Sequence, residues 1–136
     1  MQFAGMNYLA IVVAAAAAYV FSAIYYTALS KPWLKAAEVK KGGRKAAAWI
    51  PFVIAAAADL IMAWVLAGVI GHLGVGQVTL KNGVISGAFI WFGFVLTVIA
   101  VNYAFAGRKP MLTAIDAIHW LGVLIVLGAI IGLFGV

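Results

Sequence analysis

Two ionisable residues near the C-terminus, Asp116 and His119, have the types and the spacing that chemistry inside a membrane would need. They lie three residues apart in an apolar run that continues to Val136, so on a helix they share a face with Thr113, one turn earlier. An acid and an imidazole on one face can relay a proton, bind a cation or polar ligand, or serve as base and orienter in catalysis. Ionisable groups at membrane depth are costly, so they indicate a functional site.

Three more polar residues in apolar runs complete the predicted site: Tyr26, Asp59 and Asn102. Asp59 lies about ten residues inside the expected membrane interface, or roughly 15 Å along a helix, near the middle of a bilayer core about 30 Å thick. The other four residues of the site lie closer to the expected loops, all in the same half of the bilayer. We expect the five side chains to line one polar cavity that binds or transports a small molecule or ion.

Simpler interpretations compete with this one. Asp116 and His119 could only hold helices together, since polar contacts between membrane helices contribute roughly 0.5 to 2 kcal/mol each. Asp59, Asp116 and His119 together resemble a facial metal triad in type, but only the Asp-x-x-His spacing supports it. An enzyme ranks last because no nucleophile motif accompanies the pair. The chain has no cysteine, which excludes disulfides and thiolate chemistry. We expect no cofactor.

The elements that must position these residues are membrane helices. The 136 residues are 68% apolar, and the mean hydropathy is +1.18, far above soluble domains. Long unbroken apolar runs exclude a transmembrane barrel. We predict one all-α transmembrane domain, an antiparallel bundle of four helices over residues 7–29, 46–71, 83–105 and 111–136. The first run lacks a basic leader, so we expect a retained helix rather than a signal peptide.

The charges predict the topology. Eight of the nine basic residues lie in the loops 30–45 and 106–110, and only Lys81 lies in the second loop. By the positive-inside rule these two loops are cytoplasmic and both termini lie outside. The net charge of +6 is therefore a topology signal and indicates no nucleic-acid partner. The lipid bilayer is the expected partner, with anionic lipid near the basic first loop.

Small residues on helix faces indicate helix packing, either within this bundle or against other membrane proteins. Gly83 and Gly87, and again Gly128 and Gly132, have the GxxxG spacing that allows close helix approach. We expect both pairs to pack helices within the bundle. The alternative is a structural or assembly protein that binds other membrane proteins through such small-residue faces. Transport would require a homo-oligomer, because one bundle of this size has little room for an alternating-access path.

Short motifs add a resemblance to a known family. Residues 22–28 read Ser-Ala-Ile-Tyr-Tyr-Thr-Ala, followed by Trp33. This is similar to the Gly-x-x-Trp-Tyr-Ser-Pro segment, with a later Trp, of the DUF1761 family of uncharacterised bacterial membrane proteins. Further matches, covering nearly the whole chain from Met6, are Trp91-Phe92-Gly93-Phe94, Asn102-x-x-Phe105, Gly107-Arg108 and His119.

The sequence also departs from the family pattern. Ala106 stands where the family often has Glu, and Asp116 where it often has Asn, which weakens an essential acid role for Asp116. The resemblance implies a bacterial inner-membrane protein with this helical topology. It implies no activity.

Overall fold

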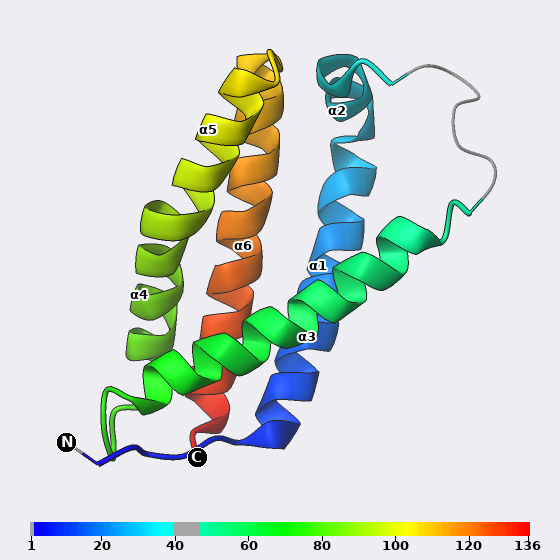
Figure 1. Ribbon diagram of the computed structural model, residues 1–136. Helices are drawn as coiled ribbons and strands as arrows, with labels where there is room; N and C mark the ends of the chain where they lie inside the picture. Colours follow the sequence, from blue (N-terminus) through cyan, green and yellow to red (C-terminus); the bar gives the residue numbers. More distant parts are fainter. Residues whose placement is uncertain (1, 40–46) are drawn as a thin grey trace.

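The computed structural model describes residues 2–39 and 47–136. These residues form four long helical spans, which follow one another along the chain. The spans are α1 (Tyr8–Ala28), α3 (Ile50–Gly71), a continuous third span and α6 (Pro110–Phe134). The third span consists of α4 (Leu80–Ile90), the π-helix η1 (Trp91–Leu96) and α5 (Thr97–Phe105). Successive spans run in opposite directions (Figure 1). All four are long and apolar enough to cross a membrane, which confirms the predicted four-helix membrane bundle.

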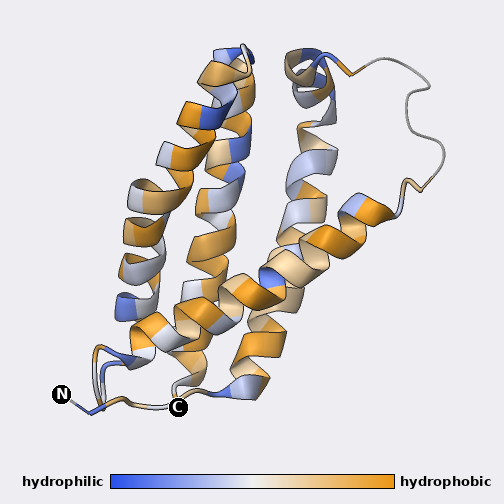
Figure 2. Cartoon of the chain, viewed as in Figure 1, coloured by the Kyte–Doolittle hydropathy of each residue, from blue (hydrophilic) through white to orange (hydrophobic). Residues whose placement is uncertain are grey.

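Helix α6 is the centre of the bundle. It packs along the third span on one side and along α1 on the other, while α3 crosses both α1 and α6 obliquely (Figure 1). The core lies where α1, α3 and α6 meet, and its largest fully buried side chains are Leu66, Ile70, Val123, Leu124 and Leu127. Apolar residues predominate along all four spans (Figure 2), and many of their large side chains are exposed, as contact with lipid requires.

The glycines of α4 and α6 let these two helices touch backbone to backbone. A Cβ atom on Gly83 would collide with the carbonyl oxygen of Gly128, and a Cβ on Gly128 would collide with that of Gly83. A Cβ on Gly87 would collide with Leu124, and one on Gly132 with Thr79. Both GxxxG pairs therefore pack within the bundle, as the sequence predicts.

The prediction that residues 30–45 form a loop was wrong in part, because the first eight of them form a helix. Helix α2 (Ser30–Ala37) follows α1 after a break at Leu29, and Pro32 lies in its first turn, where a missing amide costs little. Lys109 Nζ lies 3.4 Å from Glu38 Oε1 just beyond α2, an exposed ion pair that contributes little stability. The basic residues Lys40, Lys41, Arg44 and Lys45, and the predicted helix start at residue 46, lie outside the described residues.

The third span begins earlier than predicted. The predicted helix starts at residue 83, whereas α4 starts at Leu80, so that Asn82 and Gly83 lie in its first turn. Thr79 caps this helix, since its Oγ1 accepts a hydrogen bond from the Asn82 amide at 3.2 Å. The cap competes successfully with the turn tendency of Asn-Gly.

Candidate functional site

Asp116 is buried in α6 and accepts three hydrogen bonds. Its Oδ1 accepts from the Tyr26 hydroxyl at 2.7 Å and from the Trp33 indole at 3.0 Å, and its Oδ2 accepts from the Tyr103 hydroxyl at 2.6 Å. These donors come from α1, α2 and α5. The carboxyl group, only 7% exposed, therefore ties three other elements to α6. Its acceptor capacity is used by the protein itself, which indicates a structural role.

His119, one turn further along α6, is 4% exposed and hydrogen-bonds Ser22 of α1. The distance from His119 Nε2 to Ser22 Oγ is 2.7 Å, and the Ser22 hydroxyl donates to the Ala18 carbonyl at 3.0 Å. A hydroxyl has only one proton to donate, so Ser22 must accept from His119. We therefore assign the Nε2–H tautomer to His119.

This tautomer leaves a lone pair on His119 Nδ1. That atom is buried and has no hydrogen-bond partner. The opposite tautomer would instead bury an unpaired N–H donor, which folded proteins avoid more strictly than an unpaired acceptor. His119 thus presents an unsatisfied acceptor within the bundle.

Asp59, in the middle of α3, is the second unsatisfied group. Its side chain is 2% exposed, and Oδ2 is buried without a hydrogen-bond partner. Buried polar atoms in native proteins nearly always have a partner, and at membrane depth an unpaired carboxyl is especially costly. No group of the described chain supplies Asp59 Oδ2 with a hydrogen bond, so a partner from outside the chain would explain why this acid is kept.

Asp59 and His119 line the same cavity, which has a volume of about 660 Å³ and lies between α1, α3 and α6. Aromatic and hydroxyl side chains supply most of the remaining wall. They are Tyr19, Ser22 and Tyr26 of α1, Phe52 of α3 and Trp120 of α6. The wall continues to Thr27 and Ser30, so the cavity extends toward the end of the bundle that carries α2. Its size is that of a small-molecule site.

The structure brings four of the five predicted site residues to this region. Tyr26 and Asp116 hydrogen-bond each other, the Tyr26 and His119 rings are 4.6 Å apart, and Asp59 lies across the cavity on α3. The fifth, Asn102, is exposed and lies outside the cluster. Its predicted place is taken by Tyr103.

The π-helix η1 explains this shift by one residue. With α-helical periodicity along the whole span, Asn102 would share a face with Trp91. A π turn closes i→i+5 hydrogen bonds and inserts an extra residue, so the face beyond it advances by one position. Trp91 does face α6, since its indole donates to the Ala117 carbonyl at 2.7 Å. After η1, the residue that faces α6 is therefore Tyr103.

Trp33 and Tyr25 were also missed as partners of α6. The Trp33 indole donates to Asp116, and the Tyr25 hydroxyl donates to the Ile115 carbonyl at 2.7 Å. The indole N–H of Trp and the hydroxyl of Tyr seek acceptors when they are partly buried, which was the available signal.

Metal and enzyme chemistry find little support in this geometry. Within residues 2–39 and 47–136, no three His, Asp or Glu side chains gather as a metal site would require, so Asp59, Asp116 and His119 do not form a triad. Ser22 and His119 resemble a nucleophile and base in type, but His119 Nδ1 has no orienting carboxylate. In the described structure, Asp116 and His119 form no hydrogen bond with each other.

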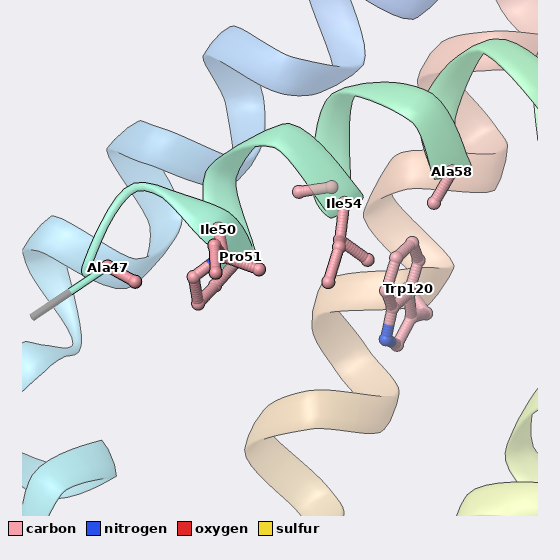
Figure 3. A pocket seen from close by; sticks show the side chains of 7 residues that line it. Ala47, Ile50, Pro51, Ile54, Ala58 and Trp120 are labelled. Atoms are coloured by element: carbon pink, nitrogen blue, oxygen red, sulfur yellow. The ribbon is translucent and has the colours of Figure 1, made fainter. Parts of the chain in front are cut away.

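A second pocket, of about 600 Å³, lies between the N-terminal half of α3 and Trp120 of α6 (Figure 3). Apolar side chains, Ile50, Pro51 and Ile54 among them, supply its wall together with Trp120. It holds neither of the unpaired polar atoms. Its chemistry suits a lipid acyl chain, and we assign it no site.

The unpaired carboxyl predicts that Asp59 costs stability in the ligand-free protein. Replacing it in Asp59→Leu should raise the free energy of unfolding by about 1 to 2 kcal/mol, because a buried acceptor without a partner is removed and the cavity leaves room for the larger side chain. Thermal unfolding in detergent, followed by circular dichroism, measures this. The same exchange at the satisfied carboxyl, Asp116→Leu, should lower stability. A loss of stability in both variants would mean that Asp59 has a partner.

The chain matches the model of a known protein family over nearly its whole length. The model of the family described as "Protein of unknown function (DUF1761)" matches residues 9–132. No curated protein and no solved structure matches the chain.

Proposed function

The chain belongs to the DUF1761 family of proteins of unknown function, and we propose that it binds a small polar molecule or ion in the cavity between α1, α3 and α6. One observation carries this proposal. Two buried polar atoms, Asp59 Oδ2 and His119 Nδ1, lack partners, and both residues line this one cavity. The atoms themselves are buried, so a small rotation of each side chain toward a bound ligand would give both a partner and explain why a membrane protein keeps them.

We further propose that the cavity opens to the cytoplasm. The cavity reaches Ser30, at the bundle end that also carries the basic residues Lys31, Lys35, Arg108 and Lys109. Positive charge marks the cytoplasmic side, which leaves both termini outside and favours a bacterial inner membrane. Lys31 and Lys35 of α2 would lie among headgroups, where anionic lipid attracts them.

Transport of the ligand across the bilayer would require a second copy of the chain. The cavity is formed at one end of the bundle, whereas the other end of the core is filled by large side chains such as Leu66, Ile70 and Leu127. A single bundle thus offers a binding site without a path through it.

The assembly alternative, in which small-residue helix faces bind other membrane proteins, gains no support from the GxxxG pairs. Gly83, Gly87, Gly128 and Gly132 pack between α4 and α6 of the same chain. They leave no free glycine face on those helices for another membrane protein. The cavity is therefore the feature that a function should explain.

Cysteine accessibility tests the cavity directly, because the natural chain has no cysteine. Ala55 lines the cavity one turn before Asp59, whereas Ala57 is exposed on the opposite side of α3 at nearly the same depth. In Ala55→Cys, a water-soluble methanethiosulfonate should label the thiol from the cytoplasmic side of inside-out vesicles. In Ala57→Cys, lipid should slow labelling on the order of tenfold or more, since the reactive thiolate is disfavoured there.

Mass spectrometry of the labelled protein measures both rates. Equal labelling of the two variants, or no labelling of Ala55→Cys from either side, would contradict a water-accessible cavity. Faster labelling from the outer side would keep the cavity and reverse the proposed topology.

A further inference from the structure

We propose that the ligand of this cavity is an organic cation that donates hydrogen bonds, such as a primary ammonium ion attached to a small apolar group. This inference rests on the proposed binding function and names the chemical class of the ligand. It follows from three properties of the cavity wall: the kind of unpaired atom, the sign of the charge, and the aromatic surface.

Both unpaired atoms are acceptors. Asp59 Oδ2 is a carboxyl oxygen, and the Nε2–H tautomer assigned to His119 leaves a lone pair on its Nδ1. A ligand that completes this site must bring donors. A ligand without donors, such as an ether, would leave both atoms unsatisfied, whereas an ammonium group carries up to three N–H donors.

The charge of the wall has one sign. Among the described residues that line the cavity, Asp59 is the acidic one and none is Lys or Arg. The ionised carboxylate would be strongly disfavoured alone at this depth, and a bound cation compensates it with a charge-assisted hydrogen bond. Asp116 lies just behind Tyr26 and adds negative potential from the same side. An anionic ligand would be repelled by both carboxyl groups.

The aromatic surface favours an organic cation over a metal ion. Tyr19, Tyr26, Phe52 and Trp120 all line the cavity. Aromatic faces attract organic cations and contact their apolar parts, whereas hard metal ions require a shell of oxygen ligands. Within the described part of the chain, no group of acidic and histidine side chains forms such a shell. The volume of about 660 Å³ accepts a ligand considerably larger than a bare ion.

Calorimetric titration of the purified full-length protein in uncharged detergent tests this class. Benzylammonium carries the charge and the donors, benzyltrimethylammonium the charge alone, benzyl alcohol a donor without charge, and benzoate the opposite charge. We expect benzylammonium to bind most tightly and benzoate not at all. In Asp59→Asn its affinity should fall about ten- to hundredfold. The control Asn102→Ala, at an exposed position outside the cavity, should bind as the natural protein does.

The outcomes separate this inference from the proposed cavity. If Ala55→Cys is labelled but benzyl alcohol or benzoate binds as tightly as benzylammonium, the cavity stands and the cation class is wrong. The class is equally wrong if Asp59→Asn binds benzylammonium unchanged, or if the natural protein shows no saturable ammonium binding up to about 10 mM. If Ala55→Cys is not labelled, the proposed cavity itself fails.

Discussion

Asp116→Ala is expected to lower the free energy of unfolding by about 3 to 5 kcal/mol, the largest loss for any single polar side chain of this bundle. The substitution leaves the Tyr26 hydroxyl, the Trp33 indole and the Tyr103 hydroxyl without their shared acceptor. Each buried donor left unpaired costs about 1 to 3 kcal/mol. Because the donors come from α1, α2 and α5, the loss loosens three contacts with α6 at once.

Chemical unfolding in mixed micelles, followed by tryptophan fluorescence, measures this loss. Asp116→Asn is the matched control. Its amide oxygen can still accept from Tyr26 and Trp33, so about 1 kcal/mol should be lost. Equal stability of Asp116→Ala and the natural protein would contradict a structural role, and the three hydrogen bonds would then need a functional explanation.

Gly83→Ala is expected to destabilise the bundle by about 3 kcal/mol, although it adds only a methyl group. The new Cβ would collide with the backbone carbonyl of Gly128, and a backbone atom in the middle of a helix cannot move aside as a flexible side chain can. Helices α4 and α6 must separate, which loses close packing along the whole contact between them.

Gly93→Ala in η1 is the control for this prediction. Nothing lies within 4 Å of a Cβ on Gly93, so the change should alter stability by no more than about 1 kcal/mol. In the double variant Gly83→Ala/Gly128→Ala the two losses should not add, because both report the same contact. Thermal unfolding of the natural protein, the single variants Gly83→Ala, Gly128→Ala and Gly93→Ala, and the double variant in one detergent measures these changes. Similar stabilities of Gly83→Ala and Gly93→Ala would contradict the close approach at Gly83, because helix propensity favours alanine at both positions.

The candidate site was predictable to the extent that it depends on residue type and helical spacing. Asp116 and His119 were placed on one face of one helix because a three-residue separation leaves no choice on an α-helix. Asp59 was placed near mid-depth by counting from the interface, and it is buried there. The roles of the two acids were not predictable, since they depend on which donors other helices supply.

The error at Asn102 shows where counting fails. A six-residue π-helix leaves no clear mark in the sequence WFGFVL, yet it shifts every later side chain of that span by one position. Helix α2 was missed for a related reason. Its eight residues are too few, and too polar, to form a membrane-length apolar pattern, and it is held by the contact of Trp33 with a residue 83 positions away.

The amino-acid sequence alone was sufficient for the class of protein, the number of spans and their approximate ends, because each depends on local hydropathy and on the thickness of a bilayer. It was also sufficient to predict that the glycine pairs are packing positions. The tertiary structure was needed to distinguish Asp116, satisfied by three donors, from Asp59 and His119, each with an unpaired acceptor in one cavity. That distinction depends on contacts between helices far apart in the chain, and spacing along one helix carries no information about them.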